Sequence, residues 1–208
     1  MSTSGQYHHG DLRAACLRAA MDLLEESGAT ALSLRAVARQ AGVSPAAPYR
    51  HYANREALIS AVAALGYRDL SEHLAAVHPE PATPDDLADV AVAYVQFALR
   101  RPALFRVMFG EPCDPDSDER VAAVSAISAY VEAIGKRCFP VAEPEALATA
   151  IWALVHGLAF LHLDGKLDAA TPETVADRVN AAVRAVLTVS AVAPSQSVAA
   201  GLATSASE

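Results

Sequence analysis

Apolar residues recur along this chain at intervals of three and four positions, the spacing that lines one face of an α-helix. Within residues 11–27, for example, Leu12, Cys16, Ala19 and Leu23 fall on one face, with charged residues between them. No stretch shows the alternation of apolar and polar β-branched residues that is typical of a strand. The pattern therefore predicts an all-α fold.

Four helices fit into roughly the first seventy residues, at about residues 11–27, 33–41 and 44–52 and from residue 54 onward. Each of the later three follows a residue whose side chain can accept a bond from a free helix N–H, and glycines stand where the first two end. These cap and stop residues are Ser33, Ser44, Asn54, Gly28 and Gly42.

Prolines interrupt the pattern between residues 78 and 84 and mark a boundary. Beyond it, the periodicity predicts helices at about residues 85–100, 102–109, 116–138, 143–163 and 172–192. The serine- and alanine-rich end of the chain shows no periodicity. We therefore expect a flexible arm over residues 1–10, a helical domain over 11–70, a larger helical domain over 71–192 and a disordered tail over 193–208.

The charge is distributed unevenly along the chain. Residues 1–60 hold six arginines and five acidic residues, whereas residues 61–208 hold the other ten basic residues and nineteen acidic ones, so the net charges are +1 and −9. This asymmetry is expected where only one end of a protein meets phosphate. The acidic total of −8 therefore does not exclude a nucleic-acid partner.

Composition excludes several other classes. Of the 208 residues 53% are hydrophobic, so the chain is too apolar to be mainly disordered. The longest apolar run, over residues 150–163, is shorter than the ~18–20 residues of a membrane span. Three scattered cysteines do not suit a disulfide framework or a zinc site. We expect a cytoplasmic protein without a secretion signal, membrane partner, metal or cofactor.

The two short helices over residues 33–41 and 44–52 are joined by a Gly-Val turn, which is the arrangement of a DNA-binding helix-turn-helix. The motif has Val37-Ala38 in its first helix, Gly42-Val-Ser44 in its turn, an aromatic-rich second helix and then Asn54-Arg-Glu-Ala-Leu58. This combination resembles the DNA-binding domain of the tetracycline-repressor (TetR) family over about residues 10–60. The resemblance implies an N-terminal three-helix DNA-binding domain followed by a larger helical domain that dimerises and binds an effector.

The residues expected to contact DNA gather around the turn and the helix that follows it. Ser44 offers a hydroxyl and a backbone N–H to phosphate, and the small side chains of Ala46 and Ala47 allow a close approach to base edges. The resemblance implies that Tyr49 and His51 touch phosphates or base edges. The predicted DNA-binding set is Arg35, Ser44, Ala46, Ala47, Tyr49, Arg50, His51 and Arg55.

Three aromatic or basic residues in this region carry a more specific expectation. Arg55 matches the position at which the TetR family grips a phosphate. Tyr52 occupies the family's buried Phe position, so we expect it in the core rather than on DNA. Tyr49 fits the core and the DNA surface about equally.

Pro48 departs from the ordinary residue that most of the family carries before the tyrosine. It has no N–H to donate to the Ser44 carbonyl, and proline disfavours α geometry at the residue before it, here Ala47. We call the second helix of the motif, over residues 44–52, the reading helix, and we expect it to be bent or to begin late.

The C-terminal half suggests a dimer. Residues 150–163 are apolar nearly all round and need cover on every side, which a core and a partner subunit would supply. The final helix has an apolar stripe, so two helices from each chain predict a four-helix interface; the stripe is Val175, Val179, Ala182, Val186 and Val189. Trp152-x-x-x-His156-Gly157 also resembles the Trp-His-Gly (WHG) subgroup, which implies a fold and a dimer rather than a ligand.

An apolar small-molecule effector is expected in the helical domain. The candidate lining residues, mostly aromatic, are Phe97, Phe105, Met108, Phe109, Tyr130, Ile134, Trp152, His156 and Phe160. An ordinary core explains the same spacing, and His156 also fits a hydrogen-bonded core histidine beside a packed tryptophan.

The sequence thus predicts a ligand-responsive transcriptional regulator, most simply a repressor that binds a pseudo-palindromic DNA operator as a homodimer. The helix that begins at residue 54 would carry motion between effector and DNA. The alternative is a helical small-molecule-binding protein or enzyme without a DNA-binding role. That alternative needs a nucleophile–base pair or paired carboxylates, and the sequence shows no such motif. A non-specific architectural DNA binder conflicts with the acidic net charge.

Overall fold

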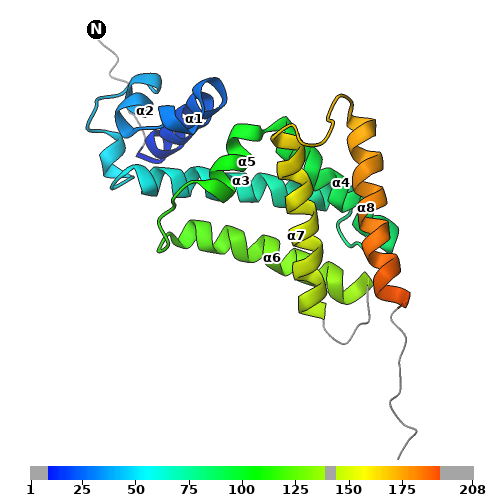
Figure 1. The fold of residues 1–208 in the computed structure, drawn as a ribbon. Coiled ribbons are helices and arrows are strands. Elements are labelled where there is room, and N and C mark those ends of the chain that lie inside the picture. Colours follow the sequence, from blue (N-terminus) through cyan, green and yellow to red (C-terminus); the bar gives the residue numbers. More distant parts are fainter. Residues whose placement is uncertain (1–8, 139–143, 193–208) are drawn as a thin grey trace, which may run out of the picture.

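In the computed structural model the chain is described over residues 9–138 and 144–192, and no strand occurs in these ranges. The predicted all-α fold is confirmed (Figure 1). The helices are α1 (His9–Ser27), α2 (Leu34–Gln40), α3 (Arg55–Val77), α4 (Pro84–Arg100), α5 (Pro102–Gly110), α6 (Asp118–Cys138), α7 (Pro144–Leu163) and α8 (Pro172–Val192), with short 3-10 turns η1 (Ala29–Ala31) and η2 (Pro48–Arg50).

Local signals set the helix ends near the N-terminus. The Ser33 hydroxyl accepts a hydrogen bond from the Ala36 N–H at 3.1 Å, and the Asn54 side chain accepts one from Ala57 at 2.8 Å. Gly28 and Gly42, with φ of 75° and 66°, both have the positive φ that glycine readily adopts after a helix. The predicted caps at residues 33 and 54 are confirmed. The predicted flexible arm lies outside the described residues, except that His9 and Gly10 already belong to α1.

The reading helix differs from its prediction. No α-helix forms over residues 44–52; the Ser44 carbonyl accepts from Ala47 N–H at 2.9 Å, and the only regular segment is the 3-10 turn η2. Pro48 explains this difference because it cannot donate the next helical bond. The expected departure of Ala47 from α geometry was wrong, since its φ of −63° and ψ of −45° are those of a right-handed helix.

The long helix α3 joins the two parts of the molecule. In Figure 1 the helices α1 and α2 lie at one end of α3, and α3 then continues into the larger C-terminal bundle. There it packs against α4, α5 and α6, whereas α4 packs against α7 and α8. The expected domain boundary at residues 70–71 falls inside this helix. The predicted tail over residues 193–208 lies outside the described residues.

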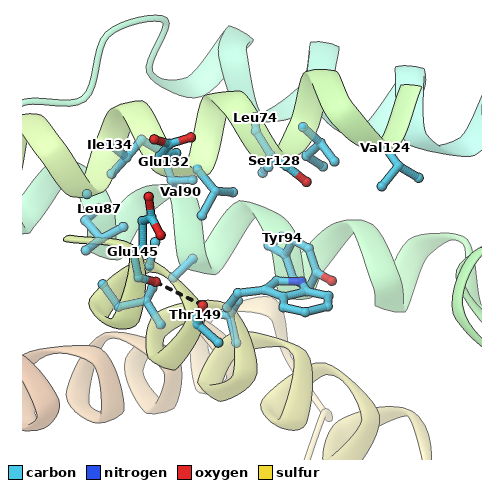
Figure 2. A pocket seen from close by; sticks show the side chains of 18 of the residues that line it. Leu74, Leu87, Val90, Tyr94, Val124, Ser128, Glu132, Ile134, Glu145 and Thr149 are labelled. Carbon is cyan, nitrogen blue, oxygen red and sulfur yellow. Dashed lines mark hydrogen bonds between the residues drawn. The ribbon is translucent and has the colours of Figure 1, made fainter. Parts of the chain in front are cut away.

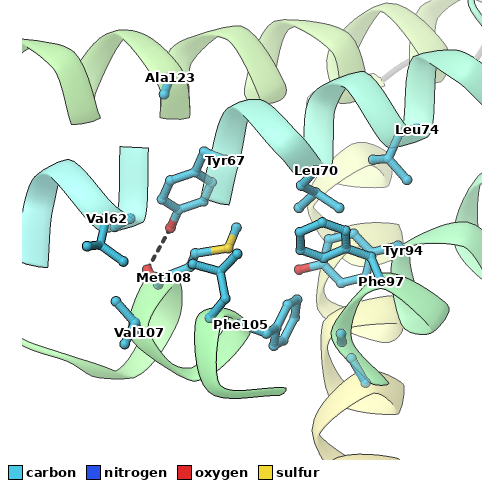
Figure 3. Close-up of a cluster of buried hydrophobic side chains, with 14 of the residues drawn as sticks. Val62, Tyr67, Leu70, Leu74, Tyr94, Phe97, Phe105, Val107, Met108 and Ala123 are labelled. Carbon is cyan, nitrogen blue, oxygen red and sulfur yellow. Dashed lines mark hydrogen bonds between the residues drawn. The ribbon is translucent and has the colours of Figure 1, made fainter. Parts of the chain in front are cut away.

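The centre of the bundle is built on close contact between α3 and α5. Tyr67 donates its hydroxyl hydrogen to the Met108 carbonyl at 2.8 Å, and Phe105 is fully buried nearby (Figure 3). A Cβ added at Gly66 would stand 2.7 Å from the Met108 sulfur, so a larger residue there would displace this side chain of α5. The apolar stripe predicted on α8 also faces this core at Val175 and Val179, which are 1% and 0% exposed.

Helix α7 is covered only in part by the other described residues. By length and composition alone, Glu145–Leu163 is apolar enough to cross a membrane, and only 28% of the most apolar stretch is buried. The exposed side chains include Trp152, at 46%, and Leu161, at 43%. Core helices of soluble proteins have the same composition, so this feature is only weak evidence for a membrane span.

Candidate functional site

The segment after the turn presents a group of predicted DNA-binding side chains to solvent. Ser44, Ala46 and Arg50 are exposed, and the Tyr49 ring is 51% exposed. Ala47 is only 8% exposed, so its methyl group packs inward instead of facing outward. It packs into the N-terminal part formed by α1, α2 and η2, which we call the head. Arg35, at the start of α2, is exposed as well.

Buried contacts hold the back of this segment in place. Tyr52 is 2% exposed, which confirms it as a core residue, and the Arg13 guanidinium carbon lies 5.9 Å from the centre of its ring. Burial raises the pKa of Tyr52. His51 is half-buried, and its Nε2 has no hydrogen-bond partner among the described residues.

The guanidinium group of Arg55 already has hydrogen-bond partners within the protein. Its Nε donates to the Leu32 carbonyl at 3.1 Å, and one terminal nitrogen donates to the Ala29 carbonyl at 2.9 Å and to the Glu111 carboxylate at 3.2 Å. The side chain therefore ties the segment before α2 to the connection between α5 and α6. Its contact with phosphate remains a prediction, and it would have to compete with these bonds.

Two further charged groups join the head to the bundle. Glu119, at the start of α6, pairs with Arg13 of α1 and Arg68 of α3. Partial burial alone would raise the pKa of Glu119, but these two guanidinium groups hold it below its usual value. Arg101 pairs with Glu25 of α1 at 2.9 Å and with Asp69 of α3 at 2.6 Å.

A cavity of about 380 Å³ lies in the bundle between α3, α4, α5, α6 and α7 (Figure 2). This volume falls within the range of small-molecule pockets. The walls are mainly aliphatic and aromatic, and their residues include Leu74, Leu87, Val90, Tyr94, Val124 and Ile127. Two glutamates, Glu132 and Glu145, also line the cavity, and Figure 2 shows them at the end away from Tyr94.

Three of the predicted effector residues line this cavity: Phe109, Ile134 and Trp152. Phe97, Phe105 and Met108 are at most 4% exposed and form the bundle core instead. Tyr130 is half-buried, and its hydroxyl donates to the His78 carbonyl at 2.8 Å. Sequence reasoning missed the aliphatic walls on α4 and α6, and Tyr94; apolar periodicity marked these helices but not which buried positions border a cavity.

His156 lies beside the cavity rather than on its wall. Its Nδ1 is 2.9 Å from the Tyr94 hydroxyl, and the rings of Trp152 and Phe160 are 5.6 and 4.9 Å away, centre to centre. Burial lowers the pKa of His156 and raises that of Tyr94. The hydrogen bond to Tyr94 matches the expectation of a hydrogen-bonded histidine, but Trp152 beside it is 46% exposed instead of packed in the core.

No group of three or more His, Cys, Asp or Glu side chains converges on a possible metal position within the described ranges. The candidate site has three parts. They are the exposed segment over residues 44–52, which we call the reading segment, the apolar cavity, and the ion pairs that join the head to the bundle.

Comparisons with known proteins cover both parts of the chain. Residues 17–62 match the family model of bacterial regulatory proteins of the tetR family, and residues 87–188 match that of the tetracyclin repressor-like C-terminal domain. The second family model does not name the WHG subgroup, so membership of that subgroup remains a prediction. An HTH-type transcriptional regulator from Mycobacterium tuberculosis is 29% identical over 119 residues, which are 53% of this chain and 50% of that protein. The match thus spans about half the length of the curated relative.

Solved structures match over most of the chain. A protein of unknown function from Rhodococcus sp. RHA1 is 33% identical, with a TM-score of 0.72, over 88% of this chain and 98% of that one. A bacterial regulatory protein of the tetR family from Rhodococcus RHA1 shares the fold, with 24% identity and a TM-score of 0.62 over 83% of this chain and 95% of that one. The chain therefore belongs to the tetR family of bacterial regulatory proteins.

Proposed function

We propose that this regulator is a repressor that binds a pseudo-palindromic operator as a homodimer and releases it when an apolar small molecule occupies the bundle cavity. The exposed reading segment carries the proposal. Tyr49 and Arg50 stand outward on η2 beside exposed Ser44 and Ala46, so hydroxyl and guanidinium groups are free to meet phosphates and base edges. The proposed place of action is the cytoplasm, where operator DNA is found.

The exposed face of α7 supports the homodimer. Small or apolar residues recur there at helical spacing, and all are exposed in the single chain: Ala146, Ala150, Ala153, Gly157 and Leu161. A Cβ added at Gly157 would meet no atom of the described residues within 4 Å, so none of them requires a glycine there. A partner helix packed closely on this face would require one and would cover Trp152 and Leu161.

The part of α8 that would join this interface differs from the predicted stripe. Val175 and Val179 face the core, whereas Ala181 and Ala185 are exposed on the other side of the helix. We therefore assign α8's contribution to the alanine face. Two-fold symmetry through α7 and α8 would present two reading segments about 34–36 Å apart, one turn of duplex DNA.

A continuous set of contacts supports the response to a ligand. Phe109 lines the cavity, and Glu111, two residues further along the chain, bonds Arg55. Arg55 in turn holds the carbonyls of Ala29 and Leu32, just before α2. A ligand that displaces the end of α5 would shift this support of the head, and it would release DNA to the extent that it binds the shifted state more tightly.

A mobility-shift assay with the DNA that flanks the gene tests the proposal. The dimer is expected to bind one specific fragment, with affinity that falls steeply between about 50 and about 200 mM salt because phosphate contacts release counterions. Equal affinity for random duplexes would contradict it.

A further inference from the structure

We propose that the cavity selects a cationic amphiphile: a molecule with an apolar body and one protonated or quaternary nitrogen, held beside Glu132 and Glu145. This inference rests on the proposed role of the cavity as the effector site, and it adds the chemical class of the effector.

The charge of the cavity wall has one sign. Of the described residues that line it, only Glu132 on α6 and Glu145 on α7 carry formal charge, and no lysine, arginine or histidine is among them. Figure 2 shows both carboxyl groups at the same end, across the cavity from Tyr94. An anionic ligand would bring a like charge to these carboxylates in a partly desolvated space, which is unfavourable.

A lysine outside the cavity lining already pairs with one of these glutamates. The Lys136 ammonium pairs with Glu132, and its side chain is 58% exposed. The hydrogen bond with Glu132 and the charge of Glu132, together with that of Glu145, raise the pKa of Lys136. Of the two glutamates, Glu132 alone pairs with this ammonium, and the two carboxylates and the ammonium together carry a net charge of −1. Because exposed ion pairs are weak, a ligand nitrogen arriving from the cavity side can replace this ammonium.

The rest of the cavity suits the apolar body of such a ligand. Most of the other lining side chains are aliphatic, among them Val90, Ile127 and Val131. Trp152 and Phe109 add aromatic surface, which attracts apolar groups and cations alike. The formal charge of the described lining is therefore confined to one end of a mainly apolar cavity, as an amphiphile with one charged group requires.

Trp152 provides a direct measurement because it is the only tryptophan of the chain and lines the cavity. The probes are decyltrimethylammonium, decanol and decyl sulfate, which share one chain and differ in head-group charge, each titrated below its micelle concentration. Tryptophan fluorescence is expected to report the tightest binding for the ammonium, with at least about a tenfold preference over the sulfate.

Three variants assign this preference to the acidic end. Glu145→Gln is expected to weaken ammonium binding about three- to tenfold and to leave decanol binding unchanged. Glu173→Gln is the matched control, since Glu173 is also exposed, follows a helix-starting proline and lies away from the cavity. Lys136→Met removes the competing ammonium and is expected to tighten binding of the cation.

The outcomes separate this inference from the proposed function. Equal binding of the three probes, or a preference for decyl sulfate, overturns the cationic class, as does unchanged ammonium binding by Glu145→Gln and Lys136→Met. Selective ammonium binding that depends on Glu145 supports it, whether or not the ligand releases DNA. Selective binding without any effect on operator affinity would instead count against the proposed response to a ligand.

Discussion

A terminal nitrogen of Arg55 lies 3.2 Å from the Glu111 carboxylate, joining the first residue of α3 to the residue after α5. The same guanidinium group donates to the carbonyls of Leu32 and Ala29. One side chain therefore connects the element that borders the cavity with the segment that leads into the helix-turn-helix. This connection gives the proposed regulation a specific place in the molecule.

Replacing Glu111 tests this connection. Glu111→Gln keeps the shape of the side chain but removes its charge, and because both partners are about one-third exposed, we expect a loss of less than about 1 kcal/mol in the free energy of unfolding. We expect operator affinity without ligand to change little. The drop in affinity caused by decyltrimethylammonium should shrink, as measured by fluorescence anisotropy of labelled operator. An unchanged drop would show that Glu111 does not carry the coupling.

Arg55 and Arg50 are expected to separate stability from DNA binding. Arg55→Ala removes two donors to backbone carbonyls and should lower the free energy of unfolding by about 1–2 kcal/mol, measured by urea denaturation. Arg50 is exposed, so Arg50→Ala should leave stability within about 0.5 kcal/mol. It should reduce the slope of log affinity against log salt by about 1. If Arg55→Ala instead lost operator affinity while keeping full stability, this result would favour the phosphate contact implied by the family resemblance.

Gly157 offers a test of the dimer that does not threaten the fold. A Cβ there meets no atom of the described residues within 4 Å, and leucine is a better helix former than glycine by about 1 kcal/mol. In a close α7–α7 contact it would clash, so Gly157→Leu should shift the protein toward monomer in light scattering, with its helical circular dichroism kept.

Ala126→Leu provides the control for Gly157→Leu, because Ala126 is an exposed position on α6. It adds comparable bulk away from the proposed interface. A Gly157→Leu variant that stays as dimeric as Ala126→Leu would contradict the assignment of α7 to the interface.

Buried histidines predict how stability depends on pH. Burial lowers the pKa of His156 and His162, and for His162 nearby Arg178 lowers it further. In the unfolded chain these groups take up protons near pH 6.5, whereas the folded protein resists protonation. The free energy of unfolding should therefore fall as the pH drops from about 7.5 to about 5.5, above the range in which glutamates titrate.

Substitution of His162 isolates one of these groups. Its side chain is 4% exposed, and neither ring nitrogen has a hydrogen-bond partner among the described residues. His162→Leu should make the loss of stability at low pH smaller in urea titrations. An equal loss in both proteins would show that His162 does not contribute.

The elements of this fold were predictable because their signals are local. The caps at Ser33 and Asn54 form as predicted, and α8 spans the predicted residues. Pro48 indicated a reading helix that is bent or begins late, whereas the structure has no α-helix over residues 44–52 and only the 3-10 turn η2. The burial and helical geometry of Ala47 were not predictable, because packing of the head outweighs the steric preference of one residue before a proline.

The candidate site depended on contacts that sequence spacing does not encode. Phe97, Phe105 and Phe109 share one aromatic pattern, yet only Phe109 borders the cavity. Which side of a buried helix faces a cavity is decided by how several helices pack together. The pair of Arg55 and Glu111 joins residues far apart in the chain, so neither residue alone indicated it.

The central claim is that two copies of the reading segment bind one symmetric operator. Nuclease footprinting of the DNA flanking the gene tests this most directly, with Arg50→Ala and Gly157→Leu beside the unmodified protein. We predict two protected half-sites related by a dyad, with centres about 34–36 Å apart along the duplex, and weaker protection by both variants. Protection of a single half-site, or no protected region with the unmodified protein, would contradict the account.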